Sequence, residues 1–352
     1  MSIQRVIIVG GFDNEEMIPT LVEGFLDLGL QVDRIPTRGV IEQHRQRDSD
    51  FAAKEIIAFP TFREKMHFRS EAEFCAELHD VVAGGPPALI LWWYAKDDRP
   101  GGLIEALPCP TVRFSWDDPM AIEAYGEDWS RGFTHAVTSC RDSIAHYEQR
   151  GIKAMWTLPP VSPTRHGQAV PTPGEECDIC FTFFTLYNGE APYLRERVKR
   201  RDLIEAAARL GVRVHVYGRR ERFGRGFMGL PEESYRGMKS NMELPGCFAA
   251  AKIAVTQHPQ IDAAGYVSPR DMEAMASGAF LLSDDAVGFS DMSSHIMLGK
   301  YRTIDEFRTW CKRVLDEREW RGMQIMRDGT RGIVLRAYSG KRFAEQLLEF
   351  VG

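Results

Sequence analysis

The stretch SPRDMEAMASGAFLLSD, residues 268–284, decides the architecture of this chain. Ser268 and Asp271 have the spacing of a capping box, in which each side chain bonds a free amide at the start of a helix. Gly278 predicts a left-handed helix end, and the apolar residues 279–282 are typical of a strand buried in a parallel sheet. A helix that runs directly into such a strand is the repeating unit of an α/β fold.

The predicted helix has two different faces. Met272 and Met275 share the face expected to pack on the sheet, whereas Arg270 and Glu273 lie on the opposite face, one turn apart. The helix dipole disfavours a cation in the first turn by ~0.3–1 kcal/mol, so Arg270 indicates an anionic partner such as a phosphate. Glu273 is placed to accept two hydroxyls of a ribose. A surface ion pair between Arg270 and Glu273 fits the spacing equally well, and both interpretations stay open.

The length and the order of the elements predict two domains. The chain has 352 residues, and one domain usually takes ~100–200. In the first part of the chain, short apolar runs alternate with helical patterns. Residues 159–176 are rich in Pro, Gly and Thr, which is the composition of a linker, and the alternation starts again after them. We therefore predict an α/β fold with two doubly wound, Rossmann-like domains at residues 1–165 and 172–335, followed by a C-terminal helix within 336–352.

The composition argues against several functional classes. The net charge is −6, with 44 Lys and Arg against 50 Asp and Glu, which gives no general attraction to nucleic acid or to an anionic membrane. The longest apolar run, residues 88–95, is far shorter than the ~20 residues of a membrane-spanning helix, and no signal-peptide pattern precedes the first strand. Seven scattered cysteines fit a reducing cytoplasm, and none has the spacing of a metal site. We expect a cytoplasmic protein without a membrane span, a metal or a cofactor.

Loops after the strands of the second domain are the expected ligand site, because open α/β sheets bind ligands beyond the carboxyl ends of their strands. One such loop contains Gly218 and Arg219, and another contains His258 and Gly265. Arg219 begins a cluster of arginines that either faces a diphosphate or forms a solvated loop. Gly265 either lets the backbone approach a phosphate closely or is an ordinary turn glycine.

Four sequence patterns carry a resemblance to a known family. They are Asp-Asp-Pro at 117–119, the Gly followed by Leu-Pro-Pro within 147–160, S-x-R-x-x-E-x-x-A-x-G-A at 268–279, and the spacing of residues 301–307. Together they resemble the CgeB-like (spore-maturation-type) glycosyltransferases of the GT-B fold, most closely over residues 245–310. The resemblance implies two Rossmann-like domains facing a cleft, with the C-terminal helix packed back on the N-terminal domain. It also implies a nucleotide sugar in the second domain, with Glu273 on the ribose and Arg270 on the phosphate.

The chain departs from this family at one position that concerns the chemistry. Many retaining relatives carry a Glu-x₇-Glu pair, but the earlier position here is Gly265, which leaves the stereochemistry and the catalytic residues open. Asp118 is the candidate base for the acceptor's proton, and its alternative role is that of an Asp-Pro turn residue. His258 either contacts the phosphate or sugar of the donor or, as a lone loop histidine, does neither.

The leading functional interpretation is a hexosyl- or pentosyltransferase. It would use a nucleotide sugar, such as a UDP- or GDP-sugar, as its substrate, and the helix dipole and arginine would stabilise the leaving diphosphate. The acceptor is left open among a glycan, a protein, a small metabolite and a modified nucleic-acid base, the last of which the acidic balance disfavours. Two alternatives remain, a nucleotide-sugar epimerase on the same fold and a non-catalytic nucleotide-sugar-binding protein.

Overall fold

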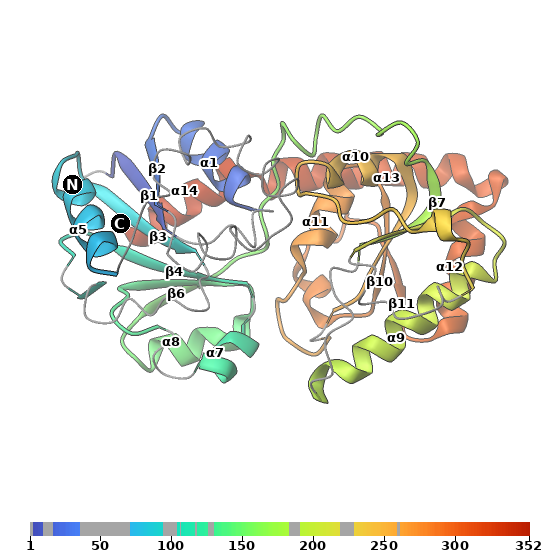
Figure 1. The fold of residues 1–352 in the computed structure, drawn as a ribbon, viewed down its shortest axis with the longest axis horizontal. Helices are drawn as coiled ribbons and strands as arrows, with labels where there is room; N and C mark the ends of the chain where they lie inside the picture. The colour runs from blue at the N-terminus through green and yellow to red at the C-terminus, as the bar shows by residue number, and fades with distance from the viewer. Residues whose placement is uncertain are drawn as a thin grey trace. The chain divides into compact units, whose positions relative to one another are not determined.

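In the computed structural model, the chain forms two compact units (Figure 1). Unit 1 comprises Met1–Pro160 together with Gly340–Gly352, and unit 2 comprises Val161–Ser339. Each unit is built on a parallel sheet with flanking helices, so the predicted α/β fold with two sheets is confirmed. The structure describes residues 3–9, 17–35, 71–93, 104–105, 107–116, 118–125, 130–182, 191–218, 229–258 and 261–352.

Unit 1 contains a six-stranded sheet in the order β2-β1-β3-β4-β5-β6. Its strands are β1 (Arg5–Val9), β2 (Gln31–Ile35), β3 (Ala88–Trp93), β4 (Thr111–Ser115), β5 (His135–Thr138) and β6 (Lys153–Trp156). Its connecting helices are α1 (Ile18–Leu26), α5 (Glu71–Ala83), α7 (Met120–Tyr125) and α8 (Ile144–Glu148). Every residue of β1, β3, β4 and β5 is buried, as expected for parallel strands that are covered on both faces.

The C-terminal helix α14 (Gly340–Val351) belongs to unit 1, where it packs on α1. At the crossing the two backbones approach so closely that a Cβ added to Gly24 would lie 2.2 Å from the Gly340 carbonyl carbon. Phe343 extends this contact into the core, where its ring lies 5.3 Å from that of Phe114. Small residues at the crossing therefore let a helix that is distant in sequence complete the core of unit 1.

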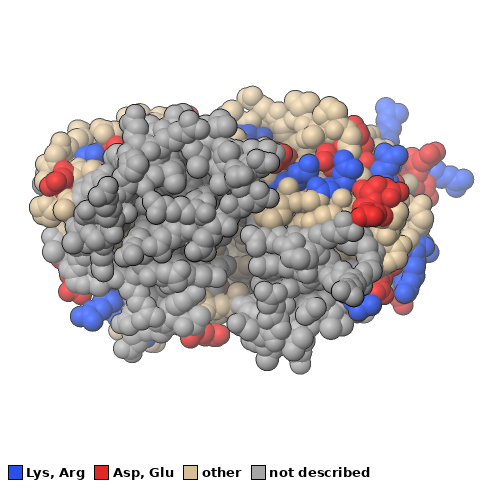
Figure 2. Space-filling model, in the orientation of Figure 1, with Lys and Arg blue, Asp and Glu red and all other residues tan. Residues whose placement is uncertain are grey.

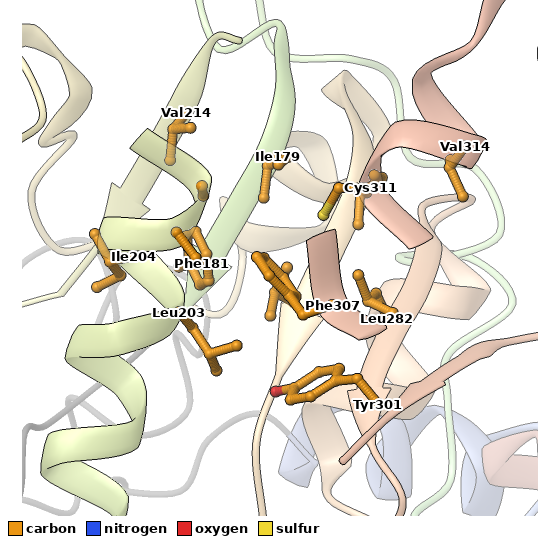
Figure 3. Packing of buried hydrophobic residues seen from close by; sticks show 14 of the residues in the cluster. Ile179, Phe181, Leu203, Ile204, Val214, Leu282, Tyr301, Phe307, Cys311 and Val314 are labelled. Carbon is orange, nitrogen blue, oxygen red and sulfur yellow. The ribbon is translucent and has the colours of Figure 1, made fainter. Parts of the chain in front are cut away.

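Unit 2 contains a five-stranded sheet in the order β11-β10-β9-β7-β8. Its strands are β7 (Cys177–Thr182), β8 (Val214–Tyr217), β9 (Ala251–Thr256), β10 (Phe280–Asp284) and β11 (Gly299–Tyr301). Its helices are α9 (Ala191–Ala208), α10 (Leu244–Ala250), α11 (Pro269–Ala276), α12 (Ile304–Leu315) and α13 (Glu317–Ala337). On one face of this sheet the rings of Phe181, Tyr301 and Phe307 form the centre of the core (Figure 3), with ring-centroid distances of 6.5 and 5.6 Å from Phe307.

The segment expected to be a linker is instead a packed part of unit 2. Val161, Ser162 and His166 are at most 1% exposed. Val161 forms a parallel bridge with Ser339, at the end of the unit. The Pro, Gly and Thr residues of this segment specify turns, and turn residues do not prevent burial when neighbouring side chains are apolar or hydrogen-bonded. The boundary between the two units falls within the predicted stretch, between Pro160 and Val161, but the residues that follow it are packed into unit 2.

The described surface carries charges of both signs. Figure 2 shows acidic and basic side chains intermixed on one face, and surface ion pairs include Arg313 with Glu319 at 2.8 Å and Lys252 with Asp178 at 2.8 Å. Within the described ranges, no helix combines the length and the apolar character needed to cross a membrane.

Candidate functional site

Helix α11 begins with the capping box that the sequence predicts. The Arg270 amide donates to the Ser268 hydroxyl at 3.3 Å, and the Ser268 amide donates to the Asp271 carboxylate at 2.9 Å. Gly278 follows the helix with φ +91°, in the left-handed region that favours glycine. The start of α11 is thus fixed by local sequence, beside the carboxyl ends of β9 and β10.

The second face of α11, which carries Glu273, is buried. Glu273 is 3% exposed and Ser277 is 2% exposed. Helix α13 packs on α11, where the Arg331 guanidinium donates to the Ala276 carbonyl at 3.1 Å and to the Gly167 carbonyl. Because these long-range contacts cover the helix, the surface ion pair between Arg270 and Glu273 does not describe this site.

His258 lies between two carboxylates at the carboxyl end of the sheet. Its Nδ1 is 2.5 Å from Asp284 Oδ1, at the end of β10, and its Nε2 is 2.5 Å from Asp271 Oδ2, in the first turn of α11. The His258 amide also donates to Asp284, at 3.0 Å. We call this set the Asp284–His258–Asp271 bridge, and it joins the ends of β9 and β10 to the start of α11.

The His258 ring of this bridge is a charged imidazolium at neutral pH. Burial by itself would lower the pKa of His258, but the two adjoining carboxylates outweigh it and raise the pKa to about 10. Both ring nitrogens therefore bond within the protein. The expected contact of His258 with phosphate or sugar is replaced by an internal role, because a ring with both nitrogens occupied has none left for a ligand.

Glu273 lies near two side chains of the 161–172 segment. His166 Nε2 lies 3.6 Å from Glu273 Oε1, and Arg165 Nη2 lies 4.0 Å from the same oxygen. The His166 Nδ1 accepts from the Ser162 amide at 2.9 Å, which assigns the ring proton to Nε2, on the side of Glu273. These distances are longer than a hydrogen bond, so neither neighbour donates a hydrogen bond to the Glu273 carboxylate.

The surroundings of Glu273 favour its neutral form. Burial raises the pKa of Glu273 to about 7, against the attraction of the Arg165 and Arg270 guanidinium groups, which lowers it. A buried carboxyl that titrates near neutrality is common at binding and catalytic sites. Two hydroxyl donors would favour the ionised form and reverse this shift.

The other expected donor-site residues lie at the same edge of the sheet or outside the described residues. Arg270 Nη1 is 3.5 Å from the carbonyl of Thr182, the last residue of β7. Gly265 has φ +78°, which only glycine adopts readily. Gly218 uses both of its backbone groups internally, since its amide donates to the Gly237 carbonyl at 3.0 Å and its carbonyl accepts from the Tyr235 hydroxyl at 2.5 Å. Arg219 lies outside the described residues.

Asp118 is enclosed in unit 1. It is 0% exposed, and its two oxygens accept from the Ser115 hydroxyl at 2.7 Å and the Tyr147 hydroxyl at 2.8 Å. Burial raises the pKa of Asp118, while the hydrogen bonds from these hydroxyls lower it. The carboxylate is thus committed to neighbours of its own unit, which is the contact pattern of a structural turn residue and not of a base that faces an acceptor.

Sequence reasoning missed Arg165, His166 and Asp284. The first two lie in the segment taken for a linker, and the contact with Glu273 joins residues more than a hundred positions apart, so no local pattern announces it. Asp284 does carry a signal, because it ends a buried strand at the edge where ligands or helix starts are found. Among the described residues, no group of His, Cys, Asp and Glu is arranged to hold a metal ion.

Comparison with known proteins finds a family model that is similar to part of the chain. Residues 195–349 match the family model described as glycosyl transferase-like. This match begins within α9, contains the whole of α11, and ends within α14. No curated protein matches the sequence. The family match therefore covers the site residues on β9, α11 and β10 and less than half of the chain.

Solved glycosyltransferases have the same fold over the full length. HepE from Anabaena, in complex with UDP and glucose, is 11% identical, with 98% of each chain covered and a TM-score of 0.63. A glycosyltransferase from Rickettsia africae is 12% identical over 100% of this chain and 98% of its own, with a TM-score of 0.63. The DNA-modifying enzyme β-glucosyltransferase is 10% identical over 99% of each chain, with a TM-score of 0.58. The fold is that of the GT-B glycosyltransferases.

Proposed function

We propose that this protein is a glycosyltransferase that binds a nucleotide sugar at the carboxyl end of the unit 2 sheet. Glu273 accepts the two ribose hydroxyls, and Arg270 contacts the diphosphate. The observation that carries the proposal is Glu273 itself, a buried carboxyl whose pKa is raised to about 7 and whose neighbours, the His166 ring and the Arg165 guanidinium, lie 3.6 and 4.0 Å from it. The family match over residues 195–349 and the fold shared with HepE support it.

The donor is a sugar linked to a nucleoside diphosphate, such as a UDP- or GDP-sugar. In this proposal the start of α11 and Arg270 stabilise the negative charge of the leaving diphosphate, without a metal or a cofactor. HepE in complex with UDP-glucose supports UDP as the first nucleotide to test. Because of the pattern at 268–279, we also propose that the protein belongs to the CgeB-like branch of these enzymes. Because its scattered cysteines are free, we propose a cytoplasmic location.

The contacts of Asp118 support a structural role, which leaves the acceptor's base unassigned. A glycan, a protein, a small metabolite and a modified nucleic-acid base all remain acceptors to be screened. β-Glucosyltransferase, which shares the fold, is a DNA-modifying enzyme, whereas the charges of both signs on the described surface disfavour a duplex acceptor for this chain.

Donor binding to Glu273 variants tests the proposal. Two charge-assisted hydrogen bonds are lost in Glu273→Ala, so UDP and GDP should bind roughly ten- to a hundred-fold more weakly, about 1.5–3 kcal/mol, by calorimetry. Glu273→Gln keeps the shape and should lose less. The matched control is Glu175→Gln, since Glu175 is also buried and paired with cations, Arg236 at 2.9 Å and Lys239 at 2.8 Å, but precedes β7 at the opposite end of the sheet.

Three further outcomes distinguish the proposed glycosyltransferase from its alternatives. Equal affinity of wild type and Glu273→Ala for both nucleotides would remove the residue that carries the proposal. Product analysis with donor alone separates an epimerase, which releases a changed sugar without an acceptor, from a transferase. Binding without turnover across all acceptor classes would favour the non-catalytic alternative.

A further inference from the structure

Gln257 forms an unusual buried pair with Arg200. Gln257 directly follows β9 and is 7% exposed, and Arg200 on α9 is 6% exposed. The Arg200 Nε donates to the Gln257 side-chain Oε1 at 3.2 Å. A guanidinium has donors only, so the amide oxygen must be the atom that faces it, and the orientation of the amide is fixed by chemistry.

The pair leaves the amide nitrogen of Gln257 without an acceptor. The Gln257 Nε2 atom is buried and donates no hydrogen bond to any acceptor among the described residues. A buried N–H₂ group without an acceptor is destabilising, and native proteins keep few such groups without a functional reason. The amide oxygen has a structural role as the acceptor of the Arg200 Nε–H group, but that role does not account for the amide nitrogen.

The position of Gln257 indicates which kind of ligand its two amide N–H groups could bind. Strand β9 lies between β10 and β7, and Phe181 of β7 pairs with Val255 of β9. Thr182, the next residue of β7, is the one whose carbonyl lies 3.5 Å from Arg270 Nη1. Neighbouring strands are about 5 Å apart, so Gln257 and the Thr182 carbonyl that lies near Arg270 are at adjacent strand ends. Both offer hydrogen-bond donors, which suits an anionic ligand rich in acceptor oxygens.

We propose that Gln257 binds the diphosphate of the nucleotide-sugar donor through its amide N–H₂ group, and that Arg200 is the positioning residue that turns this amide towards it. The proposal rests on the proposed function and adds a contact that the sequence did not single out. It assigns Gln257 to the phosphates and not to the nucleoside, because the Arg270 guanidinium lies near Thr182 at the neighbouring strand end, whereas Glu273 lies a turn further along α11.

The test is nucleotide binding by two variants of Gln257, with UDP, uridine and inorganic pyrophosphate as the probes. Gln257→Leu removes the donors, so UDP and pyrophosphate should bind roughly ten- to a hundred-fold more weakly, while uridine should bind as to wild type. The variant also removes the acceptor of the buried Arg200 Nε–H group, so the melting temperature should fall. Gln257→Glu keeps the contact with Arg200 but places a negative charge near the diphosphate, so the loss for UDP should be larger. If Gln257→Leu does not fold, Gln257→Glu decides the question alone, because its carboxylate can pair with Arg200.

A double-mutant cycle tests the role of Arg200. If Arg200 acts through Gln257, Arg200→Ala and Gln257→Leu together should weaken UDP binding no more than Gln257→Leu alone. Additive losses would assign Arg200 a separate contact and overturn its positioning role.

Failures of the two proposals are distinguishable. Wild-type affinity of Gln257→Leu for UDP overturns this inference and leaves the proposed function intact. An equal loss for uridine also overturns it, since the contact would not be with phosphate. If wild type binds neither UDP nor GDP, the proposed function fails and this inference fails with it.

Discussion

The carboxyl ends of the two sheets both hold buried carboxylates, but their partners differ in charge. In unit 1, Asp118 accepts from the neutral hydroxyls of Ser115 and Tyr147, one for each oxygen. In unit 2, Glu273 lies 4.0 Å from the Arg165 guanidinium, too far for a hydrogen bond, and the Asp284–His258–Asp271 bridge shares one imidazolium between two carboxylates. Burial alone therefore does not identify a functional carboxylate. What distinguishes the two is whether both oxygens are already occupied.

The largest effect is expected from removing the charge of the bridge. His258→Leu leaves two buried carboxylates without their shared cation, and loss of one member of a buried ion pair costs about 3–5 kcal/mol. The free energy of unfolding, measured by urea denaturation at pH 7, should fall by that amount. His215→Leu is the control, because His215 is also buried in unit 2 but stands 3.6 Å from a single carboxylate, Glu175. Equal small losses in both variants would contradict a stabilising bridge.

The raised pKa of Glu273 should make both stability and donor affinity depend on pH. A carboxyl whose pKa rises from 4.5 to about 7 on folding binds its proton more tightly in the folded state, so its stabilising effect is present below pH 4.5. That effect, about 3 kcal/mol, is lost as pH rises through 7. The difference in unfolding free energy between wild type and Glu273→Gln, measured from pH 4 to 8, should follow this curve. A constant difference would contradict the raised pKa.

Donor binding should show the opposite dependence on pH. Ribose hydroxyls donate to the ionised carboxylate, so the affinity for UDP should rise up to about tenfold per pH unit towards pH 7 and then level off. Glu273→Gln should remove this slope. Calorimetry in buffers of different ionisation enthalpy would also register the release of the proton, and absence of proton release near pH 6 would argue against the contact.

A smaller effect is expected from Asp118 in unit 1. Asp118→Ala leaves the hydroxyls of Ser115 and Tyr147 without their acceptor, which should lower the free energy of unfolding by about 1–3 kcal/mol. UDP affinity should not change, because these contacts all lie within unit 1. A change in UDP affinity that exceeds the effect on stability would give Asp118 a place in the site.

The smallest effect is expected from Asp118→Asn. Both hydroxyls can rotate to accept from or donate to the amide, so stability should change by no more than about 1 kcal/mol. Release of UDP from UDP-glucose should change less than tenfold. A fall of ~10²–10⁴-fold with unchanged donor binding would instead restore Asp118 as the general base.

The sequence by itself determined the elements whose signals are local. The capping box of Ser268 and Asp271, the glycine stop at 278 and the buried strand that follows are all fixed by residues within one or two turns of each other. The alternation of such elements was sufficient to predict the α/β fold with two sheets. By contrast, the three-residue strand β11 is too short to leave a periodic pattern, and it is held by pairing with β10.

Only the tertiary structure decided which charged side chains meet. Helical spacing placed Arg270 and Glu273 on one face, but long-range packing buried that face and brought His166 and Arg165 to Glu273. His258 looked like a lone loop histidine until strand order placed it between Asp284 and Asp271. The physical reason is range: caps and strands depend on near neighbours along the chain, whereas the partners and pKa of a buried charge depend on groups that folding brings together from distant positions.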